Sequence, residues 1–138
     1  MEEKENVLVS TRWAYRVLYI TFIVAPITAG LDKFLHLLTD WNMYLSPAVS
    51  RIIPIDSTIF MRAVGVVEIC AGIIVAIKPR IGSLIVSLWL LGITVNFLTS
   101  PAGFYDVALR DLGLALAALA LFFLSPQFCR CSCSKDNV

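Results

Sequence analysis

A single carboxylate, Glu68, lies near the middle of an apolar run that extends from Arg62 to Lys78. Gly65 and Gly72 flank it at spacings of three and four residues. On a helix these three positions share one face, because both spacings return close to the same azimuth. A carboxylate on the small-residue face of a membrane-spanning helix must face other protein, since facing lipid would leave it unpaired. The pattern therefore predicts a buried polar centre in a membrane protein.

Two interpretations of Glu68 stay open at this point. At a rise of 1.5 Å per residue, Glu68 lies on the order of 9 Å deeper in the bilayer than Arg62. It is therefore too deep to extend its charge to the membrane surface, as Arg62 can. Its carboxylate either contacts a ligand or carries a proton, or it forms a structural ion pair that sets the register of two helices.

The composition restricts the class of protein. Hydrophobic residues make up 59% of the 138 positions and charged residues only 15%, whereas a soluble domain carries about a quarter charged residues. The length corresponds to one domain. A formal net charge of +1 provides no basic field for nucleic acid, and we exclude that class of partner. The partner that the composition predicts is the lipid bilayer.

Four apolar segments are long enough to cross the hydrocarbon core, which takes about 20 apolar residues. They span about 13–31, 58–77, 81–97 and 106–124. We therefore predict an all-α fold, an integral membrane antiparallel four-helix bundle formed by residues 13–125. We expect residues 1–12 to be a loosely ordered polar leader. Pro126 is expected to end the fourth span, and residues 126–138 form a polar tail that carries cysteines.

The connection between the first two spans is too polar to cross a membrane and too aromatic for a simple linker. Its apolar side chains recur at roughly helical spacing from Phe34 to Leu45, and Pro47 and Pro54 interrupt the pattern. We predict a short amphipathic helix that lies in the membrane interface between spans 1 and 2. Lys78-Pro79-Arg80 is predicted to form a tight turn between spans 2 and 3.

The distribution of cations predicts the orientation. The side that holds both termini carries Lys4, Arg12, Arg16, Lys78, Arg80, Arg130 and Lys135, whereas the opposite loops carry Lys33 and Arg51. The positive-inside rule therefore places both termini in the cytoplasm.

This topology gathers polar residues from distant parts of the chain in the outer leaflet. They are Asp32, Lys33, His36, Trp41, Arg62, Asn96, Asp106, Arg110 and Asp111. Because an isolated intramembrane charge costs roughly 3 kcal/mol on insertion scales, we expect these groups to pair. On the fourth span Asp106, Arg110, Gly113 and Ala117 share a face, which would turn Arg110 inward. We therefore predict that Glu68 pairs with Arg110 or Arg62, beneath a roof of Asp32, Lys33 and Trp41.

Three segments resemble the DoxX-like family of small membrane proteins. They are GLDKF at residues 30–34, GVVE at residues 65–68 followed by Gly72, and RDLG at residues 110–113. The resemblance covers about residues 13–125. It implies a four-helix protein of the bacterial inner membrane, related to subunits such as the small subunit of a thiosulfate:quinone oxidoreductase. By motif, the polar positions carried over are Lys33, Glu68, Arg110 and Asp111.

Two functional classes follow. In the first, the chain is a non-catalytic subunit or accessory of a quinone-linked membrane oxidoreductase, and its polar pocket contacts a quinone headgroup or a partner subunit. In the second, it is a stand-alone binder or carrier of a small molecule, with Glu68 as the coupling carboxylate. The sequence contains no nucleophile–base pair or phosphate-binding loop, so we do not expect a self-sufficient enzyme or an intrinsic cofactor. Whether the chain forms a homo-oligomer stays open.

The C-terminal tail alternates Cys129, Cys131 and Cys133. Three thiols at this spacing lack a fourth ligand and the two-residue gap of zinc knuckles, so they are weak candidates for a metal site. We expect no metal. In the cytoplasm these thiols are expected to be reduced rather than joined in a disulfide.

Overall fold

The described part of the chain is entirely helical in its regular structure. The computed structural model describes residues 2–45, 47, 51, 55–101 and 103–132, with side chains as far as Pro126. Four long α-helices follow one another, with a short 3-10 helix after the first: α1 (Glu2–Leu35), η1 (Trp41–Tyr44), α3 (Ser57–Ile77), α4 (Pro79–Leu98) and α5 (Tyr105–Ser132). The predicted all-α class is confirmed for these residues.

All four long helices are long and apolar enough to cross a membrane. Each carries large apolar side chains on its exposed face, among them Val17 of α1, Ile73 of α3, Leu88 of α4 and Leu116 of α5. A water-soluble protein rarely exposes so many large apolar residues together, whereas lipid tails solvate them. Length, composition and surface together indicate an integral membrane protein.

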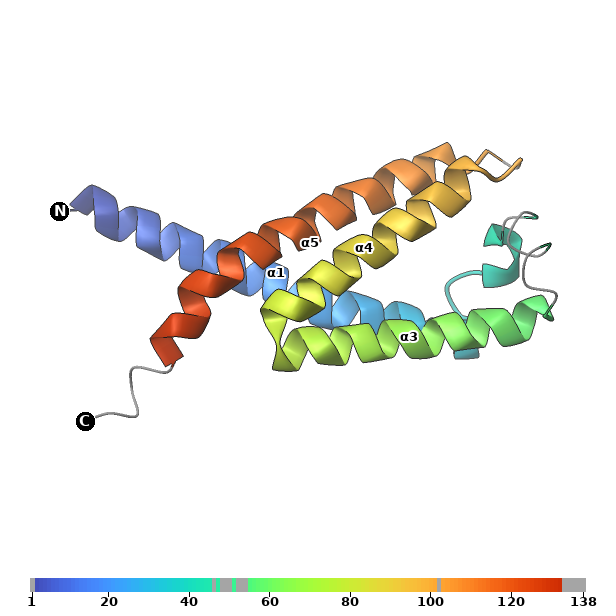
Figure 1. Cartoon of the computed structure of the whole chain (residues 1–138), viewed down its shortest axis with the longest axis horizontal. Coiled ribbons are helices and arrows are strands. Elements are labelled where there is room, and N and C mark those ends of the chain that lie inside the picture. Colours follow the sequence, from blue (N-terminus) through green and yellow to red (C-terminus); the bar gives the residue numbers. More distant parts are fainter. Residues whose placement is uncertain (1, 46, 48–50, 52–54, 102, 133–138) are drawn as a thin grey trace.

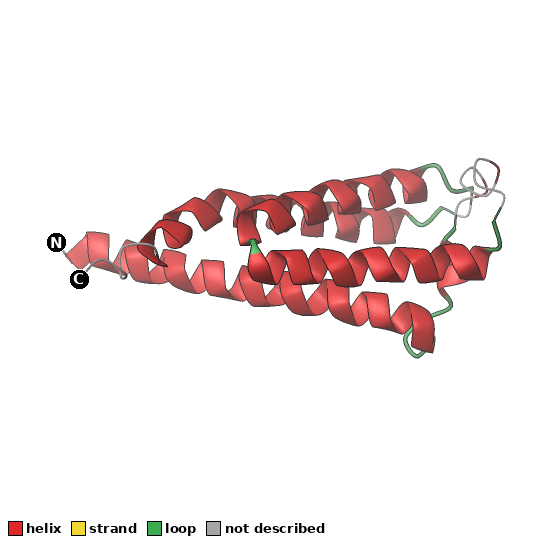
Figure 2. Ribbon diagram, turned by 60° about the horizontal axis from the view of Figure 1, so that its bottom comes forward, coloured by secondary structure: helices red, strands yellow, loops and turns green. Residues whose placement is uncertain are grey.

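The long helices pack chiefly as two pairs. α1 lies along α3, α4 lies along α5, and α3 and α4 are joined through Lys78 (Figure 1). Pro79 begins α4, where its missing N–H costs nothing. The connection between the second and third spans is tight, as predicted, but it consists of Lys78 alone, since Pro79 and Arg80 belong to α4. The N-terminal end of α1 and the C-terminal end of α5 lie at the same end of the molecule (Figure 2).

Two glycines set the closest approach of α1 to α3. A Cβ atom built on Gly30 would lie 2.6 Å from the carbonyl oxygen of Gly65, and one on Gly65 would lie 2.8 Å from the carbonyl oxygen of Gly30. The two backbones therefore touch at a point where no side chain fits. Small residues at such crossings allow membrane helices to pack by van der Waals contact where no hydrophobic force brings them together.

The apolar core lies where all four long helices meet. Its buried members are Phe22 of α1, Ala71 and Val75 of α3, Val86 of α4, and Ala118 and Leu121 of α5.

Within each helix pair, one side-chain hydroxyl bonds to the backbone of the other helix. The Tyr19 hydroxyl donates to the carbonyl oxygen of Ala76 at 2.7 Å, and Ser87 Oγ donates to that of Ala115 at 2.9 Å. Such bonds between spans are typical of membrane helices, because lipid offers these groups no partner.

Two helices extend beyond the predicted limits. α1 begins at Glu2, so residues 2–12 are helical rather than loosely ordered. At 1.5 Å per residue, α1 is about 51 Å long, against about 30 Å for the hydrocarbon core, and its polar first turns continue past the apolar part. α5 continues through Pro126 to Ser132. Helices that span membranes tolerate an internal proline better than soluble helices do.

The connection between α1 and α3 also differs from its prediction. Phe34 and Leu35 belong to α1, and the described helix that follows is the four-residue η1. Asp40 caps η1, accepting a hydrogen bond from the backbone N–H of Asn42. Most of the segment from residue 46 to residue 54, including Pro54, lies outside the described residues.

Candidate functional site

The central contact of the site joins α1 to α3. Nζ of Lys33 lies 2.6 Å from Oε2 of Glu68, and both side chains are almost completely buried. The Cα–Cβ bonds of a helix tilt toward its N-terminus. In two antiparallel helices, the side chain of Lys33 therefore tilts toward the middle of α3, and that of Glu68 tilts toward the end of α1. The two charges therefore meet at the interface of α1 and α3.

The neighbouring carboxylate, Asp32, lies in the last turn of α1 and stabilises the turn that follows the helix. One of its oxygens accepts from the backbone N–H groups of Leu37 and Leu38, at 3.0 and 2.9 Å. The other accepts from Nε1 of Trp41 at 2.7 Å. His36 adopts a left-handed backbone conformation, with φ of 51°, at the point where the helix ends. Three donors thus compensate the buried charge of Asp32 and direct η1 back toward the site.

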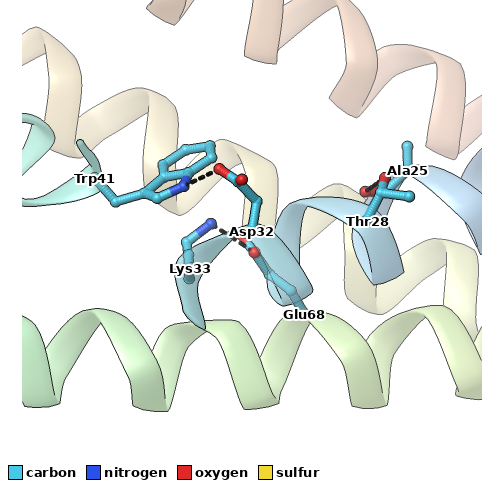
Figure 3. A network of polar contacts seen from close by, with 6 residues as sticks. All are labelled: Ala25, Thr28, Asp32, Lys33, Trp41 and Glu68. Carbon is cyan, nitrogen blue, oxygen red and sulfur yellow. Dashed lines mark hydrogen bonds and ion pairs between the residues drawn. The ribbon is translucent and has the colours of Figure 1, made fainter. Parts of the chain in front are cut away.

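Trp41 covers the ion pair. The centroid of its ring lies 3.8 Å from Nζ of Lys33, within the range of a cation–π contact. Trp41, Asp32, Lys33 and Glu68 therefore form one network, with contributions from η1, α1 and α3 (Figure 3). Asp32 and Trp41, two of the three residues predicted to form the roof over Glu68, belong to this network. Lys33, however, is the direct partner of Glu68 and does not belong to the roof.

η1 also contacts the other helix pair. The Nδ2 of Asn96 on α4 donates to the carbonyl oxygen of Tyr44 at 3.2 Å. The Tyr44 ring packs against Phe97 and Phe104, with ring centroids 5.8 and 4.9 Å apart. η1 is therefore bound to α1 through Trp41 and to the α4–α5 pair through Tyr44, and it lies between the two pairs (Figure 1).

The second helix pair contributes two more groups near the ion pair. Asp111 of α5 is buried and lies close enough to act electrostatically on both Lys33 and Glu68. The indole of Trp89, midway along α4, also lies near Glu68. The site thus brings three buried carboxylates and one ammonium together from different helices.

Three of the predicted site residues lie outside this network. Arg62 and Asp106 are exposed, and no hydrogen bond or ion pair joins either to another described residue. Arg110 is also exposed, and its Nε contacts its chain neighbour Asp111 at 3.3 Å. The prediction that Glu68 pairs with Arg110 or Arg62 is therefore wrong.

The reason for that error is the rotation of α5. Its buried positions include Ala108, Asp111, Ala115, Ala118 and Leu121, which turns Arg110 and Gly113 to the outer surface. The predicted face of Asp106, Arg110, Gly113 and Ala117 has the right spacing but the wrong orientation. Alanine occurs on both sides of this helix, so its sequence does not distinguish the inner face.

The sequence analysis also missed residues that the site uses. Trp89 lies midway along an apolar span. Tryptophans of membrane helices favour the interfaces, so this unusual position was a usable signal for a residue of the site. The sequence pattern groups Tyr44 with the apolar residues that recur between Phe34 and Leu45. Nothing in the sequence near it indicates that its carbonyl oxygen bonds to Asn96.

The described residues contain no group of three or more His, Cys, Asp or Glu side chains placed to hold a metal ion. The cysteines of the tail are not part of that statement. Cys133 lies outside the described residues, and the side chains of Cys129 and Cys131 are not described either.

Comparisons of this chain with protein-family models, with curated proteins and with solved structures found no significant match.

Proposed function

We propose that this chain forms an antiparallel four-helix bundle in the bacterial inner membrane and is a DoxX-like, non-catalytic subunit or accessory of a quinone-linked redox system. The observation that carries the proposal is the convergence of the three segments that prompted the resemblance. Gly30 contacts Gly65, Lys33 pairs with Glu68, and Asp111 lies beside that pair. Segments that are far apart in the chain but form one buried polar centre support a shared role.

The state of Glu68 favours a subunit over a carrier. Its carboxylate is paired with Lys33 at 2.6 Å beneath the ring of Trp41. A coupling carboxylate would have to leave this partner in every cycle, and separating a buried ion pair is costly because it leaves an uncompensated charge. A preformed polar centre that needs no such rearrangement suits a subunit that presents a fixed surface to a quinone headgroup or a partner.

The orientation belongs to the same proposal. With both termini in the cytoplasm, the ion pair and η1 lie toward the outer leaflet, and η1 forms the interfacial element between the first two spans. Quinones dissolve in the bilayer, so a headgroup would approach a site at this depth from the membrane rather than from water.

The experiment uses membranes of the cell that naturally makes the protein. We expect membranes that lack the chain to reduce quinone more slowly from at least one electron donor, and re-expression to restore the rate. A tagged copy should copurify with an oxidoreductase subunit in mild detergent. Re-expression of the Gly92→Ala variant is the control and should restore the rate as well, because an added Cβ at this position meets nothing within 4 Å. Unchanged quinone reduction, together with a tagged protein that purifies alone, would contradict the proposal.

A further inference from the structure

Four exposed cations lie near the end of the bundle where α3 passes into α4. They are Arg12 and Arg16 of α1, Lys78 between α3 and α4, and Arg80 in the first turn of α4. None of the four forms an ion pair with another described residue. The sequence offers few acids to neutralise them, because none lies between Glu5 and Asp32 or between Glu68 and Asp106. This end of the bundle therefore carries uncompensated positive charge.

One hydrogen bond brings the cations of α1 level with the connection between α3 and α4. The Tyr19 hydroxyl donates to the carbonyl oxygen of Ala76 at 2.7 Å, so α1 passes the last turn of α3 at Tyr19 (Figure 1). Arg12 and Arg16 precede Tyr19 by seven and three residues, which places all three on one face of α1. Because the two helices are antiparallel, Arg16 lies about 4.5 Å beyond Tyr19 and Lys78 about 3 Å beyond Ala76 in the same direction.

This level corresponds to the headgroups of a bilayer. α3 runs for 21 residues from Ser57 to Ile77. At 1.5 Å per residue its length is about 31 Å, against about 30 Å for the hydrocarbon core. Lys78 follows the last residue of α3 and therefore lies at the boundary between lipid tails and headgroups.

Two aromatic rings position the guanidinium groups at this boundary. Cζ of Arg16 lies 5.4 Å from the centroid of the Trp13 ring, and Cζ of Arg80 lies 5.3 Å from that of Phe122 on α5. The rings provide no oxygen to accept hydrogen bonds from the guanidinium N–H groups. These donors therefore remain available for an anion.

The start of α4 adds backbone donors to the same place. Lys78 precedes Pro79, the first residue of α4, and no side chain caps this end of the helix. The backbone N–H groups of the first turn, and the positive end of the helix dipole, favour a negative group there. Two cationic side chains, those of Lys78 and Arg80, flank this helix end, an arrangement that suits a phosphate group.

We propose that these four cations form a basic surface that binds the phosphodiester headgroup of an anionic phospholipid. Basic side chains at the membrane surface attract such headgroups, and arginine donates two parallel hydrogen bonds to a phosphate. Exposed apolar side chains lie next to the cations along the chain: Val17, Ile77 and Ile81. They would contact the acyl chains of the same lipid. Cations beside an apolar surface favour a lipid over a soluble phosphate, whichever side of the membrane the surface faces.

The first test measures the lipid selectivity of the purified full-length chain. Native mass spectrometry in a neutral detergent detects bound lipids by their mass. Titrations with phosphatidylglycerol and phosphatidylcholine of identical acyl chains compare an anionic with a zwitterionic headgroup. Because each cation near the headgroup contributes about fivefold in affinity, we expect phosphatidylglycerol to bind at least about tenfold more tightly. Excess inorganic phosphate should not displace it, because phosphate has no acyl chains. Equal binding of the two lipids, or displacement by inorganic phosphate, overturns the proposal.

The second test locates the surface with variants that each remove two positive charges. The two pairs on the basic surface are Arg12→Gln/Arg16→Gln and Lys78→Gln/Arg80→Gln. We expect each pair to weaken phosphatidylglycerol binding by on the order of twentyfold and to leave phosphatidylcholine binding unchanged.

The matched control is Arg62→Gln/Arg110→Gln, which removes two exposed cations near the opposite end of the bundle. This variant should keep the preference for phosphatidylglycerol. An equal loss in the control would show that net charge, not the basic surface, attracts the lipid, and it would overturn the assignment. Full preference in both surface variants would overturn it as well. If a double variant does not fold, its two single variants decide, each with an expected loss of about fivefold.

Discussion

Nζ of Lys33 lies 2.6 Å from Oε2 of Glu68 across the interface of α1 and α3, and Trp41 covers the pair. The arginine nearest to this site along α5, Arg110, extends outward instead. The polar centre is therefore held by a lysine that leans inward from the end of one helix to reach the middle of another.

Breaking this pair from one side should be costly. Glu68→Gln leaves a buried ammonium without its counter-charge, and we expect it to lower the free energy of unfolding by about 3–5 kcal/mol. The double variant Lys33→Met/Glu68→Gln should lose less than the sum of the two single variants, because it removes both charges. Unfolding in mixed detergent micelles measures each value.

Arg62 provides the matched control for this cycle. Its side chain is exposed, so Arg62→Met and Glu68→Gln should be additive. Coupling of Glu68 to Arg62, with additivity at Lys33, would contradict the observed pairing.

The backbone contact between α1 and α3 should not accept a side chain. Gly30→Ala and Gly65→Ala each place a Cβ less than 3 Å from a carbonyl oxygen of the facing helix. The helices must separate, and we expect a loss of about 1–3 kcal/mol. Thermal melting of the purified protein measures the effect.

Two other glycines serve as controls for that series. An added Cβ at Gly92 or Gly113 meets nothing within 4 Å. Because alanine favours a helix over glycine by about 0.5–1 kcal/mol, these variants should be neutral or slightly stabilising. Equal destabilisation at all four positions would show that the close contact between α1 and α3 at Gly30 and Gly65 does not govern the result.

Trp41→Phe should release η1 from α1. The variant keeps a ring over Lys33 but loses the indole N–H that donates to Asp32 at 2.7 Å. We expect faster backbone hydrogen exchange at Leu37 and Leu38, whose N–H groups bond to the same carboxylate. Trp13→Phe, which alters an exposed contact with Arg16, is the control. Unchanged exchange in Trp41→Phe would mean that Asp32 holds the turn without Trp41.

The proposed orientation, with both termini in the cytoplasm, predicts the reactivity of the cysteine tail. In a Cys70→Ser background, an impermeant maleimide added to intact cells should fail to label Cys129, Cys131 and Cys133. The same reagent should label them after lysis. A cysteine introduced at Ser57, the first residue of α3, should react without lysis and serves as the positive control. Efficient labelling of the tail in intact cells would reverse the orientation and move the polar centre toward the cytoplasmic leaflet.

The sequence by itself determined the helices and one inner face. Long apolar runs allow few structures other than spanning helices, since lipid cannot bond to free backbone groups. The faces of α3 were also predictable. Gly65, Glu68 and Gly72 are all buried, because a carboxylate and two glycines at these spacings leave only one side suitable for contact with protein.

Only the tertiary structure decided which cation meets Glu68. The prediction favoured arginines by depth and reach, but the choice depends on how each helix is rotated and which helix it faces. α5 turns Asp111 inward and Arg110 outward, a rotation that its alanine-rich sequence does not specify. α1 crosses α3 at Gly30 and Gly65, and that crossing brings Lys33 within reach of Glu68. Contacts between residues distant in the chain arise from packing of whole surfaces, which no local pattern encodes.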